Sequence, residues 1–242
     1  MFGFPKKISG PFFSAVIVAS DIFPQKNTGQ QAPFDEFSVV IRSVSAYEAC
    51  SRIREIVLVC PEADIPEYYA LVQDYRLDKV SSVVGGGPDR QDSVFRGIEA
   101  CSKEAAYYVI HDGARPLVAP QVIDCCIDAA LQHGAAAAGV PVMDTIKVHD
   151  EAGFIVNTPN RSQLAAIQTP QIFEAPLYRR AMEMARRSGR TFSDDCQMVE
   201  ASGKQVYISQ GSFDNIRITT SEDFILADAI LTNREKETSA WL

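Results

Sequence analysis

A run of glycines followed by charged residues, GGGPDRQDS at residues 85–93, is the first place where this 242-residue chain could handle a phosphate or a base. Glycine lets a ligand approach the backbone closely, and the first turn of the helix that follows offers unpaired N–H groups to an anion or a base edge. The alternative interpretation is an ordinary glycine turn in which Asp92 or Ser93 caps that helix.

A second candidate, IHDGARP at residues 110–116, places a carboxylate at the end of an apolar run and an arginine three positions later. Asp112, at the carboxyl end of a strand, could hold Mg²⁺ against the phosphates of a substrate. The same residues could instead form a turn in which Asp112 pairs with Arg115, and the residues alone leave both interpretations open.

Two further segments carry isolated arginines beside polar residues. Arg161 precedes QTPQ at residues 168–171, and Arg217 lies in DNIRITT at residues 214–220. Each guanidinium could clamp a phosphate with two hydrogen bonds, or could be a solvated surface charge. The acidic pair at 194–195 is typical of a helix start, where carboxylates favour the helix dipole without a catalytic role.

These segments must be positioned by secondary structure, and the pattern around them is regular. Continuous apolar runs predict strands at 13–19, 54–60, 79–84 and 106–111, and apolar residues at helical spacing predict helices at 38–51, 65–75 and 92–101. Strands too apolar to alternate, separated by helices, indicate an α/β protein with a parallel sheet covered on both faces. Such a sheet binds its ligands at the carboxyl ends of its strands.

The rhythm changes after a predicted helix at 121–133 and a predicted strand at 135–142. Two short runs at 144–148 and 154–156 flank a turn-forming EAG, which predicts a β-hairpin. A projecting hairpin has little core of its own, so we expect residues 143–160 to form a dimerisation arm. Predicted helices at 176–188 and 221–231 and a strand near 206–209 follow, and we expect residues 1–242 to form a single domain.

Composition argues against several classes of function. With 46% hydrophobic and 22% charged residues the chain looks globular, and its net charge of −8 argues against a nucleic-acid or membrane-surface binder. The six cysteines form no C-x-x-C pair, so we expect reduced thiols and neither a zinc site nor disulfides. No run approaches the ~18 apolar residues that span a bilayer, and Pro5, Lys6 and Lys7 would interrupt a signal peptide, so we expect a cytoplasmic protein.

Taken in order, the motifs resemble one family. GGxxRxDSV, HDGARP, PVxDTIK, RxxL followed by QTPQxF, and DNIRIT followed by ED run from about residue 83 to about residue 231. Their order and spacing are those of the 2-C-methylerythritol 4-phosphate cytidylyltransferases, and five motifs in succession are specific where one would be weak. Relatives that act on ribitol 5-phosphate share part of the set, but HDGARP and PVMDTIK fit the methylerythritol group better.

The resemblance implies a Rossmann-like nucleotidyltransferase fold with a mostly parallel central sheet and a projecting β-hairpin arm. It implies transfer of a cytidylyl group from CTP to a polyol phosphate, with Mg²⁺ as the cofactor and a homodimer formed through the arm. It assigns metal binding to Asp112, and nucleotide binding to Ala19, Ser20, Gly86, Gly87, Arg90, Ser93, Ala114 and Arg115. It assigns the polyol phosphate to Thr145 (reaching across the dimer), Arg161, Thr169 and Arg217, the last at a position where the family usually has lysine.

The chain departs from the family after its first strand. The family has AAGxGxR there and PKQ about seven residues on, a loop whose arginine and lysine stabilise charge on the triphosphate. This chain has ASDIFPQK at residues 19–26, with Asp21 where the first glycine is expected and no PKQ after it. Lys26 is the local candidate to replace the lost cations and joins Asp112, Arg161 and Arg217 in the expected catalytic set, although it could also be a plain surface lysine.

Two classes of function therefore stay open from the sequence. In the first, the chain is a working cytidylyltransferase with an unusual loop, acting on methylerythritol phosphate or on another polyol phosphate such as ribitol 5-phosphate. In the second, it keeps the fold and sugar-phosphate binding but not catalysis. We expect the first, because the remaining motifs are intact in order and spacing.

Overall fold

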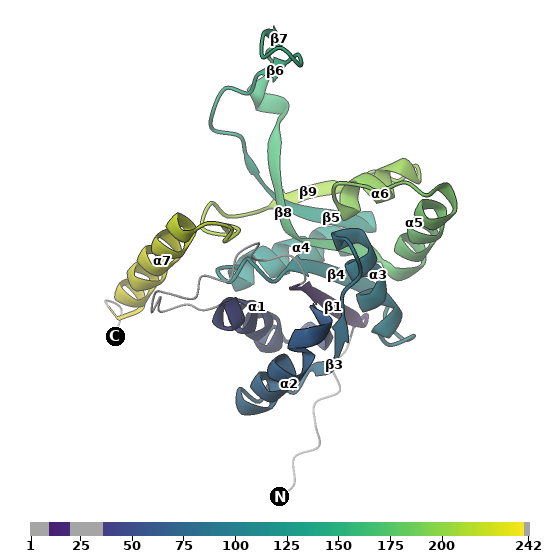
Figure 1. Ribbon diagram of the computed structural model, residues 1–242, viewed down its shortest axis with the longest axis vertical. Coiled ribbons are helices and arrows are strands. Elements are labelled where there is room, and N and C mark those ends of the chain that lie inside the picture. The colour runs from purple at the N-terminus through teal and green to yellow at the C-terminus, as the bar shows by residue number, and fades with distance from the viewer. Residues whose placement is uncertain (1–9, 20–35, 240–242) are drawn as a thin grey trace, which may run out of the picture.

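The computed structural model describes residues 10–19 and 36–239, and Figure 1 shows a central sheet with helices on both sides. In this part of the chain the sheet has seven strands in the order β3-β2-β1-β4-β8-β5-β9. They are β1 (Phe13–Val18), β2 (Ile53–Cys60), β3 (Val80–Gly85), β4 (Tyr107–Asp112), β5 (Ala135–Pro141), β8 (Ala165–Glu174) and β9 (Tyr207–Gln210). A separate hairpin pairs β6 (Val148–His149) with β7 (Ile155–Asn157).

All strands of the main sheet but one run in the same direction. β1 pairs in parallel with β2 and β4, β2 with β3, and β5 with β9, whereas β8 is antiparallel to both β4 and β5. Every residue of β1 (FSAVIV) is buried, because helices cover both of its faces. This double burial explains why the strand sequences are continuous apolar runs.

Two sets of helices cover the two faces of the sheet. α1 (Glu36–Ala49), α2 (Ile65–Asp74) and α4 (Pro120–His133) share one apolar core with the strands, and α3 (Arg90–Ala100), α5 (Ala175–Ser188) and α6 (Asp195–Ala201) share the other. α7 (Ser221–Ser239) packs on a smaller cluster with Val39, Leu117 and Ile218. Two single 3-10 turns, η1 (Glu62–Asp64) and η2 (Arg161–Gln163), complete the described elements.

The predicted α/β architecture is confirmed, and the first four strands begin and end within two residues of the predicted bounds. The sequence does not predict β8, because Pro170 lies in its middle and proline removes a backbone donor that a central strand normally uses. The alternative interpretation of residues 85–93, which gives the helix cap to Asp92 or Ser93, is wrong about the capping residue. α3 begins at Arg90, and its N-cap is Asp89, whose carboxylate accepts the N–H of Asp92.

The hairpin of β6 and β7 stands clear of the main sheet in Figure 1, as the predicted projecting arm should. β6 has two residues, fewer than the run at 144–148 that predicts it, whereas β7 has three residues, as does the run at 154–156. Three apolar residues of the hairpin are exposed: Phe154 is 73% exposed, Ile155 63% and Val156 61%. Core residues of the same types are almost fully buried. Within the described residues no helix combines the length and apolarity needed to cross a bilayer.

Candidate active site

The candidate site lies where β1, β2, β3 and β4 end together. Val18 is in register with both Val59 and Asp112, and Cys60 is in register with Gly85. Backbone bonds continue the alignment past the strands, since Ala19 N–H donates to Val59 O and Gly86 N–H donates to Cys60 O. The parallel sheet thus brings the segments predicted to bind the nucleotide to one edge. Ser20, Asp21 and Lys26 lie outside the described residues.

Asp112 closes β4 and is held between two arginines. Arg90 Nη2 lies 3.2 Å from its Oδ1, and Arg115 Nε lies 3.4 Å from its Oδ2. Burial raises the pKa of the Asp112 carboxyl, but the charges of Arg90, Arg115 and Arg217 outweigh burial and hold this pKa below its usual value. The carboxylate is therefore ionised, and local positive charge is gathered around it in a chain whose net charge is −8.

Arg90 joins two carboxylates from different elements. Its Nη1 donates to Asp195 Oδ2 at 2.8 Å, while its Nε and Nη2 approach Asp112 Oδ1 at 3.3 and 3.2 Å. Burial alone would lower the pKa of Arg90, but the charges of Asp195 and Asp112 raise this pKa by more than burial lowers it. The guanidinium therefore keeps its proton. The sequence indicates only a helix-start role for Asp195, because the separation of these residues in the chain hides their contact.

Side-chain hydrogen bonds of His111 and Thr169 fix the backbone around Asp112. The Thr169 hydroxyl contacts His111 Nδ1 at 2.9 Å and accepts the Asp112 N–H at 3.0 Å, and His111 Nε2 lies 3.2 Å from Arg115 O. Burial lowers the pKa of His111 to about 3, so the ring is neutral. Since a carbonyl only accepts, Nε2 carries the proton and Thr169 donates to Nδ1. Substrate binding by Thr169 stays a prediction; its hydroxyl is buried in this network.

The glycine turn of residues 85–93 has a defined internal geometry. Gly87 N–H donates to the Ser93 hydroxyl at 3.0 Å, and that hydroxyl donates to Asp89 O at 2.8 Å. A side chain at Gly87 would put its Cβ 2.3 Å from the Cβ of Asp92, so only glycine fits this turn without a shift. Arg96 Nη1 donates to Gly86 O at 2.8 Å. The turn is thus held in place before any ligand arrives.

The DNIRITT segment joins the site through backbone contacts. Arg115 Nη1 donates to Asn215 O at 2.7 Å, and Ile218 N–H donates to Ala114 O at 2.8 Å. These bonds place Arg217, which is exposed, close enough for its charge to lower the pKa of Asp112. The structure therefore gathers the 85–93, 110–116 and 214–220 segments at the carboxyl ends of the strands, where a sheet of this kind has its ligand crevice.

Thr145 lies in the arm, and Arg161 follows directly after it in η2. Both are exposed, and Arg161 donates to Met143 O in the arm. Figure 1 shows the arm pointing away from the main sheet. Substrate binding by these two residues stays a prediction, and for Thr145 it depends on a second chain.

The residues at the crevice suit a metal that arrives with its substrate. Among the described residues no group of three or more His, Cys, Asp or Glu side chains is arranged to hold a metal ion. Mg²⁺ is commonly bound through one or two carboxylates together with substrate phosphates and water. Asp112 alone, at the carboxyl end of a central strand, fits that arrangement and not a permanent all-protein site.

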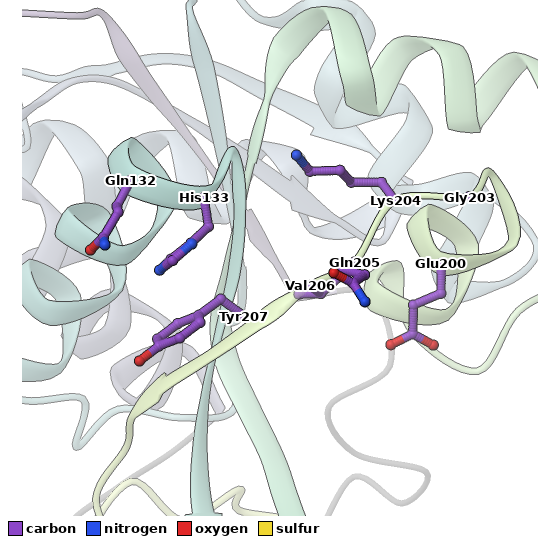
Figure 2. Close-up of a pocket in the computed structure, with 8 residues that line it drawn as sticks. All are labelled: Gln132, His133, Glu200, Gly203, Lys204, Gln205, Val206 and Tyr207. Atoms are coloured by element: carbon purple, nitrogen blue, oxygen red, sulfur yellow. The ribbon is translucent and has the colours of Figure 1, made fainter.

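A cavity of about 1060 Å³ lies elsewhere, beside the last residue of α4 and the first residue of β9. Figure 2 shows its polar side chains, among them Gln132, Glu200 and Lys204. His133 stacks on Tyr207 there, with ring centroids 4.2 Å apart. Because β9 and the neighbouring β5 begin at this edge, the cavity lies at the amino ends of the strands, opposite the candidate site.

Comparison with known proteins finds relatives over most of the chain. The family model for 2-C-methyl-D-erythritol 4-phosphate cytidylyltransferase matches residues 26–233. A 2-C-methyl-D-erythritol 4-phosphate cytidylyltransferase of Clostridium botulinum (strain Langeland) is 39% identical over 221 residues, which cover 90% of this chain and 96% of that protein. One from Geobacillus kaustophilus is 37% identical over 228 residues, which cover 93% and 99%.

Solved structures give the same result. The crystal structure of 4-diphosphocytidyl-2C-methyl-D-erythritol synthase from Anaerococcus prevotii superposes with a TM-score of 0.81 at 28% identity, over 93% of this chain and 100% of that one. The 2-C-methyl-D-erythritol 4-phosphate cytidylyltransferase of Thermus thermophilus superposes with a TM-score of 0.70 at 28% identity, over 89% and 97%. The family match begins at residue 26, the last residue of the segment 19–26 where the motif comparison finds the departure.

Proposed function

Since the chain belongs to the 2-C-methyl-D-erythritol 4-phosphate cytidylyltransferase family, we propose that its crevice transfers a cytidylyl group from CTP to 2-C-methyl-D-erythritol 4-phosphate. The activity belongs to isoprenoid precursor biosynthesis. One structural observation carries the proposal: an ionised Asp112 lies at the carboxyl end of β4 among Arg90, Arg115 and Arg217. A carboxylate and cations in one crevice suit a triphosphate with its divalent ion.

The reaction needs positioning more than covalent help from the protein. An oxygen of the 4-phosphate attacks the α-phosphorus of CTP, a new P–O bond forms, and the bond to the β-phosphate breaks to release pyrophosphate. Arginines stabilise the charge that spreads over the phosphoryl oxygens, and a fixed crevice keeps the reacting groups in line. Bound Mg²⁺ would neutralise phosphate charge, and Asp112 would hold it.

The glycine turn is assigned to the nucleotide base. Gly86, Gly87 and Ser93 lie in a turn whose shape is fixed by its own hydrogen bonds, so it can present backbone groups to cytosine without rearranging. Arg217, together with Arg161, is assigned to the phosphate of the second substrate. An arginine can meet a phosphate with two parallel hydrogen bonds.

The arm is assigned to a homodimer, in which it carries Thr145 to the crevice of the partner. Exposed apolar side chains at Phe154, Ile155 and Val156 support this assignment, because monomeric proteins rarely expose contiguous apolar residues. We place the protein in the cytoplasm, as its sequence leads us to expect.

The reaction is tested by what pyrophosphate release requires. Release should need CTP, the methylerythritol phosphate and Mg²⁺ together, and should stop when the metal is chelated. Ribitol 5-phosphate should react more slowly than 2-C-methyl-D-erythritol 4-phosphate. Release that proceeds equally well without the polyol phosphate would instead indicate CTP hydrolysis and would refute the proposed transfer.

A further inference from the structure

Asp195 is a buried carboxylate beside the crevice that the family motifs leave without a task. It is only 4% exposed. Its place at the start of α6 does not explain it, because the neighbouring Asp194 is the N-cap and accepts the N–H of Gln197. A carboxylate buried without need costs free energy unless it is paired and hydrogen-bonded, so its partners indicate its role.

Each oxygen of Asp195 has one partner, and the two partners come from different helices. Tyr178 of α5, which is fully buried, donates its hydroxyl to Oδ1 at 2.6 Å. Arg90 of α3 donates Nη1 to Oδ2 at 2.8 Å. The hydroxyl of Tyr178 thus fixes one oxygen of Asp195, and the other oxygen binds the guanidinium of Arg90.

The opposite edge of the same guanidinium contacts Asp112. Arg90 Nε and Nη2 approach Asp112 Oδ1 at 3.3 and 3.2 Å. A guanidinium is planar and its donors form a rigid fork, so fixing Nη1 also fixes the plane and direction of the other donors. The chain of contacts runs from Tyr178 through Asp195 and Arg90 to the carboxylate at the end of β4.

We propose that Asp195 is a positioning residue for the transfer reaction, which holds the Arg90 guanidinium so that Asp112 keeps one orientation in the crevice. This inference rests on the proposed function for the reaction that it serves. Because Arg90 also pairs with Asp195, the positive charge of its guanidinium is shared between two carboxylates and does not neutralise Asp112 alone. If Asp195 is neutralised, Arg90 moves toward Asp112, and the carboxylate loses its place and its freedom to bind a cation.

The first test compares Asp195→Asn with a matched buried carboxylate. Asp195→Asn should lower kcat by about 10–100-fold, as expected for a residue behind a metal ligand, while KM for CTP changes by less than about threefold. The control is Glu55→Gln. Glu55 is 9% exposed, and its carboxylate accepts hydrogen bonds from the hydroxyls of Ser14 and Ser81 near the amino ends of the strands. The Glu55→Gln substitution should lower Tm without lowering kcat.

The second test asks whether Asp195 acts through Arg90. Combining Asp195→Asn with Arg90→Lys should lower kcat no further than Arg90→Lys alone, because the positioned group is already gone. Losses that multiply would refute the path through Arg90. Tyr178→Phe, which removes only the anchoring hydroxyl, should lower kcat in the same direction by a smaller factor.

The third test reads the arginine itself and needs no turnover. In the protein labelled with ¹⁵N at arginine, exchange of the Arg90 Nε–H with water should be slow, and should accelerate at least tenfold in Asp195→Asn. The Arg90→Lys spectrum assigns the signal. A parent chain that releases no pyrophosphate would refute the proposed function alone, whereas an unchanged Arg90 exchange rate, or an unchanged kcat in Asp195→Asn, would overturn the positioning role.

Discussion

At the scale of single residues, charge in the crevice is concentrated on Asp112 and the arginines around it. Its ion pairs with Arg90 and Arg115 keep it ionised although its side chain is only 14% exposed, which is costly unless the partners hold good geometry. The backbone of the same residue is fixed separately, through the hydroxyl of Thr169. The side chain and the main chain of Asp112 can therefore be tested by different substitutions.

Asp112→Asn should lower cytidylyl transfer by at least about a hundredfold, because it removes the charge proposed to hold the metal against the triphosphate. The fold should persist by circular dichroism, with a lower Tm, since two arginines lose their counter-charge. Asp128→Asn, which changes an exposed partner of Arg52, is the control and should leave turnover unchanged. Full turnover in Asp112→Asn would remove this carboxylate from the mechanism.

Thr169→Val should reduce the free energy of unfolding by about 1–3 kcal/mol, because it leaves the Asp112 N–H and His111 Nδ1 without their shared partner. Urea unfolding measures this loss. Thr158→Val, at an exposed hydroxyl of the arm, is the control and should stay within about 0.5 kcal/mol of the parent. Equal stability of the two variants would contradict the role given to the Thr169 hydroxyl.

Lys26→Ala should lower turnover about a hundredfold if this lysine replaces the cations that the family loop supplies. Asp21→Gly should raise turnover or tighten CTP, since it removes a like charge from the expected triphosphate segment. Both residues lie outside the described part of the chain, so the prediction rests on the sequence alone. If neither substitution changes CTP binding or turnover, this segment takes no part in the reaction.

At the scale of elements, the sequence predicts the strand ends well because each ends a continuous apolar run. GGGPDRQDS begins at the last residue of β3 and IHDGARP includes the last three residues of β4, so the place of the crevice can be predicted from chain order and the parallel sheet. The pairing of Asp112 with Arg115 is one of the interpretations that the sequence leaves open, and the structure shows it. The distant partners of Arg90 and Asp112 cannot be predicted. Asp195 lies 105 residues from Arg90, and Thr169 lies 57 residues from Asp112 on a strand that its proline conceals.

The arm is the element whose role depends on a second chain. Static light scattering should give a dimer at micromolar concentration, and replacing Phe154 and Ile155 together with serine should shift the chain toward monomer. Turnover should fall with the dimer, because Thr145 could no longer reach the partner's crevice. Tyr69→Ser, which changes an apolar residue of α2 that is 60% exposed, should leave the dimer intact. A parent chain that is monomeric would refute both the dimer and the shared site.

At the scale of the whole molecule, the fold and the family follow from features spread over most of the chain, whereas the departure is confined to one short segment. The family match spans residues 26–233, and the crevice that the structure describes keeps its carboxylate, arginines and glycine turn. Composition indicates a globular protein, and the alternation of apolar runs with helical patterns indicates the α/β class. Neither predicts the local gathering of positive charge, because that depends on which distant segments the sheet brings together.

The most direct test is to identify the product. The chain should be incubated with CTP, Mg²⁺ and equal concentrations of 2-C-methyl-D-erythritol 4-phosphate and ribitol 5-phosphate, and followed by ³¹P NMR. We predict the appearance of a cytidine diphosphate diester of methylerythritol, with one pyrophosphate released for each diester formed. Absence of any diester and of pyrophosphate with both polyol phosphates, from a chain that is folded, would contradict the proposed function.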